Sequence, residues 1–167
     1  MNGIQPMPLK WPVDTCWRIA SLYGFRIHPV TQVRTFHNGI DIACPEGTPI
    51  CCPIPGYVRY RWMDEVHGGG RSLIFKGQYL AEDGLVHDVL FGFAHLSAYA
   101  DDVNLNTSKM RQAGEVIAYS GGVPGTIGAG SSTGAHLHMT TRYDGVKVNP
   151  LSLSWNIIPK QTKGADR

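Results

Sequence analysis

Two histidines, His136 and His138, stand two positions apart and are the first candidates for chemistry in this 167-residue chain. Side chains at positions i and i+2 of a β-strand project from the same face, about 6–7 Å apart. Both imidazoles could therefore reach one cavity while Leu137 packs on the other side of the strand. A chain with seven histidines can also hold such a pair by chance or for structural reasons, so the pair alone is a weak signal.

His37 and Asp41 form a second pair, four residues apart in the segment FHNGIDIACP (36–45). Apolar and polar residues alternate there as in a half-buried strand, which predicts that the two side chains share one strand face. A neutral imidazole and a carboxylate are normal zinc ligands. By itself this pair could equally be a hydrogen-bonded couple.

Together the two pairs can supply the ligands of a catalytic zinc ion. His37, Asp41 and one histidine of the second pair would give three protein ligands and leave the fourth tetrahedral position for water. Catalytic zinc sites keep such an open position, whereas structural sites are closed by four protein ligands. Imidazole and carboxylate without thiolate also favour zinc over softer alternatives. A further histidine, His95, lies between the two pairs in the chain.

Short strands joined by turns would have to position these residues. Alternating or apolar segments predict strands within the ranges 16–25, 36–45, 49–62, 72–80, 87–97, 114–122 and 135–143. The turn at Asp144-Gly145 closes a final hairpin. The glycine-rich stretch 120–135 is predicted to be a loop, and one or two helical turns are expected within 98–113.

These elements predict a mainly β fold: a compact antiparallel β-sheet domain with little helix and a long groove open at one face. We expect this single domain to span residues 16–158. Residues 1–15 are expected to form an irregular lead-in, and residues 159–167 a frayed tail.

The composition fits a folded, turn-rich domain and excludes several partners. Hydrophobic residues make up 43% of the chain, with 20 glycines and 11 prolines, so it does not have a disordered composition. The net charge of +2 without a Lys/Arg block makes nucleic acid an unsuitable partner. Weak attraction to an anionic polymer such as a bacterial cell wall is compatible with this charge. We expect the chain to be a monomer.

The four cysteines, Cys16, Cys44, Cys51 and Cys52, show no metal-binding spacing. We interpret them as buried, reduced thiols that act as small hydrophobic side chains. A disulfide between Cys44 and either Cys51 or Cys52 is the alternative.

The segment MNGIQPMPLKWPVD at the start has no apolar run of the length that a signal peptide needs, and no stretch approaches 18 apolar residues. We therefore expect no membrane span and synthesis in a cytoplasm without Sec export. A protein made in this way would act outside a cytoplasm only after something else releases it.

Several motifs, in order, resemble the lysostaphin-type zinc endopeptidases of bacterial cell walls. They are YGFRIHP (23–29), FHNGIDIA (36–43), GTPI (47–50), GYV (56–58), FAHLS (93–97), GEVIAYSG (114–121), STGAHLHM (132–139) and NP (149–150). The resemblance covers roughly residues 16–152. One departure is Met139-Thr140 after the H-L-H motif, where many relatives have Phe-Glu, and it concerns substrate contacts and not the zinc ligands.

The resemblance implies one Zn²⁺ per chain, bound by His37, Asp41 and His138. It implies that His95 and His136 stand beside the metal and serve catalysis without ligating it. The implied substrate is the stem peptide or cross-bridge of peptidoglycan, and the implied fold is a β-sandwich-like peptidase domain. Arg26, His28 and Asn38 are weaker candidates for contacts in the cleft, while His67 and His87 are interpreted as solvated, and Tyr23, Phe36 and Phe93 as core residues.

Other functions stay open at this point. A wall-cutting enzyme without an export signal fits a phage endolysin, a phage virion component, or a fragment of a longer bacterial hydrolase. A catalytically inactive relative that binds peptidoglycan or regulates another hydrolase is the main alternative, and a carboxypeptidase or amidase is a further one. The residues leave open whether a Gly-Gly bridge or a D-Ala–diaminopimelate cross-link would be cut.

Overall fold

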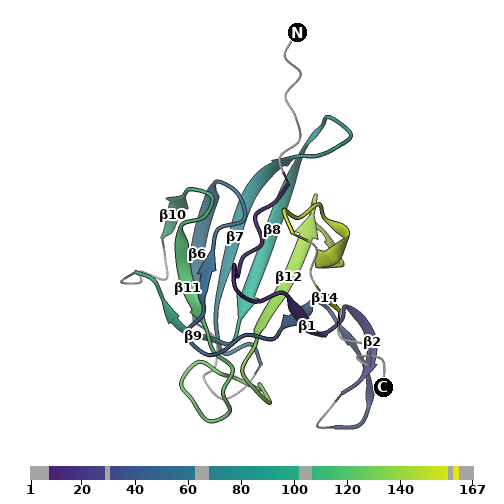
Figure 1. The fold of residues 1–167 in the computed structure, drawn as a ribbon, viewed down its shortest axis with the longest axis vertical. Helices are drawn as coiled ribbons and strands as arrows, with labels where there is room; N and C mark the ends of the chain where they lie inside the picture. Colours follow the sequence, from purple (N-terminus) through teal and green to yellow (C-terminus); the bar gives the residue numbers. More distant parts are fainter. Residues whose placement is uncertain (1–7, 29–30, 63–67, 102–106, 158–159, 162–167) are drawn as a thin grey trace.

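Strands make up most of this computed structural model, which describes residues 8–28, 31–62, 68–101, 107–157 and 160–161 (Figure 1). The described residues form fourteen strands and one short 3-10 helix at Pro150–Ser152. Asn149 caps this helix by accepting a hydrogen bond from the Leu151 amide. The prediction of a mainly β, antiparallel fold with little helix is confirmed.

The main sheet has nine strands. In spatial order they are β10 (Ser108–Arg111), β6 (Gly56–Trp62), β7 (Arg71–Leu80), β8 (Val86–Ala94), β12 (Leu137–Tyr143), β4 (Ile40–Ile42), β1 (Arg18–Ser21) and β14 (Lys160–Gln161), with β13 (Val146–Val148) paired to β12. All of these pairs are antiparallel except β1 with β14. The two residues of β14 are the described part of the predicted tail, and residues 159 and 162–167 lie outside the described ranges.

Two smaller sheets complete the fold. One has the order β5 (Pro49–Cys51), β11 (Val116–Ser120) and β9 (Leu96–Tyr99), and the other pairs β2 (Gly24–Ile27) with β3 (Arg34–His37). In Figure 1 the β2–β3 hairpin projects from the side of the main sheet that ends in β1 and β14.

The core lies between the main sheet and the three-stranded sheet. Side chains alternate along the long strands, so that Val58, Phe75 and Phe91 are fully buried while Tyr57 and Lys76 are exposed. Ile50, Leu96 and Ile117 of the three-stranded sheet belong to the same buried cluster. One face of the main sheet is therefore covered, and its other face carries the polar residues of the alternation.

The described part of the predicted lead-in, residues 8–15, is irregular but is anchored to the core. Leu9 forms an isolated bridge with Trp155, and Leu9, Trp11 and Val13 are all buried. The Trp11 indole donates a hydrogen bond to the Cys16 carbonyl and packs edge-on against Trp155. Burial of these large side chains closes one end of the core with residues that have little regular structure of their own.

The helical turns expected within 98–113 are absent from the described part of that range. Strand β9 ends at Tyr99, and Ser108–Arg111 form β10, while residues 102–106 lie outside the described ranges. Pairing of Ser108 with Arg59 at the edge of the main sheet outweighs the weak local preference for helix.

All four cysteines are buried and free, which confirms the interpretation as reduced thiols. Burial raises the pKa of the Cys44 thiol to about 11 and the pKa of the Cys52 thiol to about 12. The alternative disulfide from Cys44 to Cys51 or Cys52 is not formed. Among the described residues, no helix has the length and apolar character needed to cross a membrane.

Candidate metal centre and active site

His37 and Asp41 lie on two strands of different sheets, so their placement on one continuous strand was wrong. Strand β3 ends at His37 and β4 begins at Ile40, with a corner at Asn38-Gly39. A Cβ at position 39 would lie 2.4 Å from the Met139 carbonyl oxygen and 3.0 Å from the His138 ring. Only glycine fits this close approach, which brings β3 and β4 together over β12.

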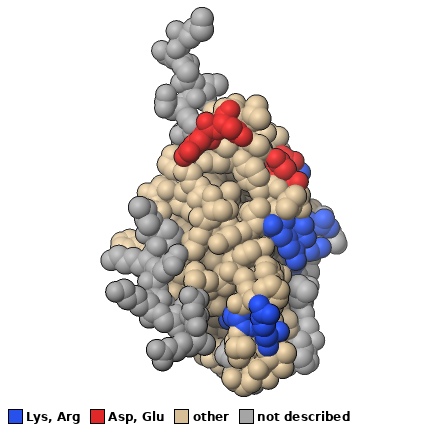
Figure 2. Space-filling model, turned by 90° about the vertical axis from the view of Figure 1, so that its right-hand side faces the viewer, with Lys and Arg blue, Asp and Glu red and all other residues tan. Residues whose placement is uncertain are grey.

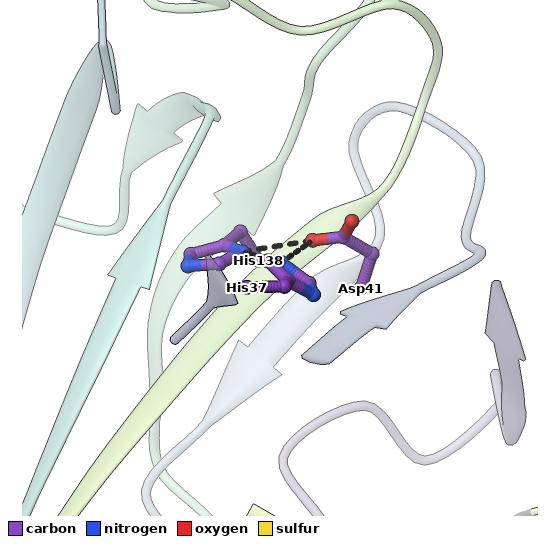
Figure 3. A group of neighbouring side chains, drawn as sticks. All are labelled: His37, Asp41 and His138. Carbon is purple, nitrogen blue, oxygen red and sulfur yellow. Dashed lines mark hydrogen bonds and ion pairs between the residues drawn. The ribbon is translucent and has the colours of Figure 1, made fainter. Parts of the chain in front are cut away.

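Three side chains converge at this corner (Figure 3). His138 Nδ1 lies 2.8 Å from Asp41 Oδ1 and 3.1 Å from His37 Nε2, and His37 Nε2 lies 3.3 Å from Asp41 Oδ1. A tetrahedral zinc with bonds of about 2.0 Å separates its ligand atoms by roughly 3.3 Å. The three donor atoms are therefore spaced as one zinc ion would require, and they form a metal-competent group in the structure.

The His37 ring is oriented by a hydrogen bond on its far side. Its Nδ1 donates to the Leu22 carbonyl at 2.8 Å, which leaves Nε2 as the free lone pair toward Asp41 and His138. Metal-ligating histidines usually make such an outer hydrogen bond, because it selects the tautomer and holds the ring. Burial also contributes, since His37 is 7% exposed.

The Asp41 carboxylate is stable in its charged form. Burial alone would raise its pKa, but interactions with the neighbouring imidazoles of His138 and His37 outweigh burial and hold the pKa of Asp41 well below its usual range. The Arg26 guanidinium lies 3.7 Å from the other carboxylate oxygen, Oδ2, and donates a hydrogen bond to Ser21. The site thus has an anionic ligand at neutral pH, as a dication requires.

His136 stands beside the three donors, just before the strand that carries His138. Its Nε2 lies 3.6 Å from Asp41 Oδ1, and its Nδ1 donates to the Gly134 carbonyl at 2.7 Å. The Ser132 hydroxyl lies 3.2 Å from the same nitrogen. Ser132 was not identified from the sequence, although its position four residues before His136 in a glycine-rich loop was a signal that could have found it.

His95 faces His136 across the pocket, with ring centroids 4.8 Å apart. Its Nδ1 donates to the Ala129 carbonyl at 2.7 Å, and its backbone amide donates to the Gly69 carbonyl at 2.8 Å. The backbone of His95 has φ +60°, which few residues other than glycine adopt. Such conformations persist only where the surroundings enforce them, and they concentrate at functional sites. Burial, with His136 close by, lowers the pKa of His95 to about 4.

Two glycine-rich loops flank His95 and bond to it. We call them the glycine clasp, made of residues 68–71 and 128–131. The Arg71 amide donates a hydrogen bond to the Gly128 carbonyl, and the Ser131 amide donates one to the Gly68 carbonyl. A Cβ at Gly70 would lie 2.1 Å from the Gly128 carbonyl oxygen, and one at Gly130 would lie 2.4 Å from the Gly68 carbonyl oxygen. The two loops can lie this close together only because Gly70 and Gly130 have no side chains.

All five predicted site residues line one pocket of about 210 Å³. Arg26 and His28, which the sequence ranked lower, also line it, together with Gly68 and residues 131–133, whereas Asn38 does not. His87 lies elsewhere, bound to Asp83 and Asp144, and His67 lies outside the described residues.

The three aromatic residues expected in the core differ in their burial. Phe93 is buried as expected, and Tyr23 is partly buried against the core cluster. Phe36 is 48% exposed on the β2–β3 hairpin, so its assignment to the core was wrong. Its ring packs edge-on against Tyr23 and Phe25, and the hairpin that carries it projects from the main sheet.

Comparison with known proteins gives the family of this chain. The model of the family described as "Peptidase family M23" matches residues 35–150, which include all five site residues. The DD-carboxypeptidase/endopeptidase Mpg of Neisseria meningitidis is 31% identical over 137 residues, covering 82% of this chain and 27% of that protein. The peptidoglycan DD-endopeptidase ShyA of Vibrio cholerae is 30% identical over 153 residues, covering 90% of this chain and 30% of that protein. The chain thus spans between a quarter and a third of the length of these curated relatives.

A solved structure agrees with the sequence comparison. The catalytic domain of the prophage-encoded M23 protein EnpA from Enterococcus faecalis, crystallised as a mutant, is similar with a TM-score of 0.59 and 26% identity. The match covers 85% of this chain and 94% of that one. The residue geometry, the matched family model and this shared fold agree, and the chain is a member of peptidase family M23.

Proposed function

We propose that this protein is a zinc metalloendopeptidase that hydrolyses peptides of bacterial peptidoglycan. The observation that carries the proposal is the convergence of His37, Asp41 and His138 at zinc-ligand spacing, open to a pocket that His95 and His136 also line. Three protein ligands with one free position are typical of catalytic zinc. All five residues come from one chain, so we propose that a monomer holds one Zn²⁺ and is a complete catalyst.

A zinc ion held by these three side chains would polarise a scissile carbonyl and lower the pKa of a bound water to about 7. The protein residues around it would then handle protons. His95 and His136 each donate Nδ1–H to a backbone carbonyl, which leaves Nε2 of each ring as the acceptor facing the pocket. A proton lost by attacking water can reside on one of these Nε2 atoms and pass to the leaving amine, an effect of about 10²–10⁴ in rate.

The substrate class is proposed from the relatives. One is named a DD-carboxypeptidase/endopeptidase and another a peptidoglycan DD-endopeptidase. Peptidoglycan lies outside the cytoplasm, so we propose that the protein acts at the cell wall. A role as a phage endolysin in host lysis is supported by the similarity to a prophage-encoded M23 protein over most of that chain.

Digestion of purified cell walls tests this function. We expect the zinc-loaded protein to release peptides with new amine termini, identified by mass spectrometry, from walls with at least one of the two cross-link types. Chelation and the variant His138→Ala should both abolish the products. No products from either wall, with zinc bound, would favour the inactive, peptidoglycan-binding alternative, and products lacking a terminal residue only would indicate a carboxypeptidase.

The lytic role needs a separate test in living cells. We expect expression in the cytoplasm to leave host cells intact until a membrane-permeabilising agent is added, after which wild-type cells should lyse and His138→Ala cells should not. Lysis of neither culture would contradict the endolysin role without affecting the peptidase assignment.

A further inference from the structure

We call His37, Asp41 and His138 the metal group. Asp41 and His138 lie on one face of the main sheet, and on that face a row of aligned residues crosses three more strands. The register pairs His138 on β12 with Asp41 on β4 and with Ala94 on β8. Continuing the β7–β8 register by one residue places Ser72 opposite Ala94, and Ser72 pairs with Arg61 on β6. A straight row of side chains on one face therefore leads from the metal group to Arg61.

The residues between the two ends of this row have small side chains. Ala94 and Ser72 lie in the row itself, and Gly92 lies in the next row on the same face, opposite Thr140. A Cβ at Gly92 would lie 2.5 Å from the Thr140 hydroxyl, so this position must stay without a side chain. The row itself is covered at its middle, because Gly69 lies against the Ala94 side chain and Ser72 is only 9% exposed. The next row on the same face runs from Thr140 over Gly92 and Ile74 to Arg59, and an extended ligand could lie on the sheet along it.

Cationic side chains gather where the row reaches β6. A hollow of about 490 Å³ is lined by Tyr57, Arg59, Arg61, Ile74, Lys76, Leu90 and Ser108. Lys76 pairs with Asp88 at 3.3 Å. Arg59 and Arg61 are exposed and make no ion pair with any described residue, and no described acidic residue lines the hollow. We call Arg59 and Arg61 the arginine pair.

On the face drawn in Figure 2, acidic side chains gather at one end of the molecule. Figure 2 shows acidic side chains at the upper end of the view, the end at which the β7–β8 turn lies in Figure 1. That turn contains Glu82 and Asp83, whereas the metal group lies where β8 ends and β12 begins. The hollow therefore presents positive charge that the acidic turn does not cancel, which favours an anionic ligand.

The spacing suits a peptide that also reaches the metal group. Neighbouring strands are about 4.8 Å apart, so three steps from β12 to β6 span about 14 Å. An extended peptide advances about 3.3 Å per residue, so about four residues cover this distance. We propose that the arginine pair binds carboxylates of an extended acidic peptide whose scissile bond lies at the metal group, about four residues away. This inference rests on the proposed peptidase function.

The arginine pair would select among peptidoglycan substrates. Stem peptides that are cross-linked directly carry free carboxylates near the cross-link, whereas an oligoglycine bridge is uncharged along its length. A guanidinium pair contributes charge-assisted hydrogen bonds only to the first kind. The arginine pair therefore favours directly cross-linked, carboxylate-rich stems over glycine bridges.

The test is equilibrium binding of two probe peptides to the zinc-loaded protein. Both are cross-linked stem peptides whose scissile amide is replaced by a non-hydrolysable methylene-amine, one with free carboxylates and one with those carboxylates amidated. We expect wild type to prefer the free-carboxylate probe about tenfold, the size that two exposed charge pairs can give, and to lose the preference at high salt. The double variant Arg59→Gln/Arg61→Gln should bind both probes equally.

A second double variant controls for net charge. Arg18→Gln/Lys147→Gln removes two exposed positive charges from β1 and β13, outside the row, and should keep the wild-type preference. Circular dichroism confirms that each variant is folded. Equal binding of both probes by wild type, or a preference that survives in Arg59→Gln/Arg61→Gln, would overturn the proposal. Because the probes are not cut, a preference without cell-wall cleavage would refute the peptidase function and leave the anion site standing.

Discussion

His136 and His138 lie two positions apart, yet the structure gives their ring nitrogens different partners. His138 Nδ1 contacts both Asp41 and His37 within 3.1 Å, whereas the Nδ1 of His136 is engaged by the Gly134 carbonyl. The first ring therefore lies among the three donors of the metal-competent group, and the second lies beside that group. This difference in hydrogen-bond partners separates the chemistry of the two histidines.

Single substitutions should separate these two roles. We expect His138→Ala to lose zinc, because two remaining ligands hold the ion poorly. We expect His136→Ala to keep zinc near one per chain while turnover falls by about 10²–10⁴, the usual contribution of a general acid or base. Zinc is measured by plasma mass spectrometry and turnover by peptide hydrolysis, with Arg18→Gln as an unaffected control. Loss of zinc from His136→Ala would mean that the two roles are exchanged.

At the scale of elements, the glycine clasp positions His95 through two of its backbone carbonyls, those of Gly69 and Ala129. We expect Gly130→Ala to lower turnover at least tenfold with zinc retained, because the new Cβ would collide with the backbone at Gly68 and Gly70 and displace the loop that bonds His95. Hydrolysis assays and zinc content measure both effects.

The control for this substitution is Gly125→Ala in the same loop. Gly125 has φ +81° but nothing within 4 Å of the place where a Cβ would lie, whereas Gly130 has φ +57° and a clash. Gly125→Ala should therefore cost about 1 kcal/mol of stability from backbone strain and leave turnover near wild type. Equal loss of turnover in both variants would show that backbone strain, and not the clasp, controls His95.

A second element-scale feature is the ion cluster that joins β8 to the β12–β13 turn. His87 lies 2.6 Å from Asp144 and 2.9 Å from Asp83, and its ring stacks on Tyr143. Hydrogen bonds that His87 donates to Asp144 and then to Asp83 raise its pKa above the ordinary value of 6.5. The pKa of Asp83 is lowered by the Leu85 amide and then by His87, and the pKa of Asp144 by His87 and then by the Asp88 amide.

These shifts predict the pH range in which the cluster stabilises the fold. A raised histidine pKa gives stability that is complete below about 6.5 and is lost as pH rises through the folded value. The lowered aspartate pKa values give stability that is complete above about 4 and is lost as pH falls through the folded values. His87→Asn should therefore reduce the melting temperature at about pH 5.5 and much less at about pH 9.

Thermal melts of wild type and variant at both pH values check this expectation. The control is Asp14→Asn, which removes the exposed pair with Lys10. Hydrogen bonding to Asp14 raises the pKa of Lys10 above its ordinary value of 10.5, so Lys10 is charged at both pH values and the effect of this substitution should not change between them. A deficit in His87→Asn that is larger at the alkaline pH would contradict the assignment.

At the scale of the whole molecule, the metal group and the core lie on opposite faces of the main sheet. Phe75, Phe91 and Phe93 point into the buried layer beneath the three-stranded sheet, while His138 and Asp41 lie on the other face. A chain of about 150 residues already buries about 70% of its unfolded surface. We therefore expect the fold to persist without zinc.

Removal of zinc by a chelator should abolish hydrolysis and leave the β-sheet circular dichroism spectrum in place. The melting temperature should fall, because an ion that binds only the folded state stabilises it by mass action. Restoring zinc should return both activity and melting temperature. Complete unfolding on chelation would show that the metal is structural.

Much of this protein could be predicted from local patterns in its sequence. Strand alternation placed β7, β8 and β12 to within a few residues, because packing of one sheet face imposes a period of two on the chain. The same period predicted that His136 and His138 face one cavity. Residue chemistry, with ordered motifs, was enough to single out five of the residues that line the pocket.

How segments far apart in the chain meet was set by tertiary packing. Three features join residues that no local pattern in the sequence connects. They are the corner at Gly39, the glycine clasp at His95 and the row from His138 to Arg61. In the described part of 98–113 the predicted helical turns are absent for the same reason, since an edge position beside β6 outweighed local preference. Short-range propensity is weak compared with pairing and packing between strands. The sequence therefore predicted which residues could do chemistry, and only the tertiary structure decided how distant segments bring them together.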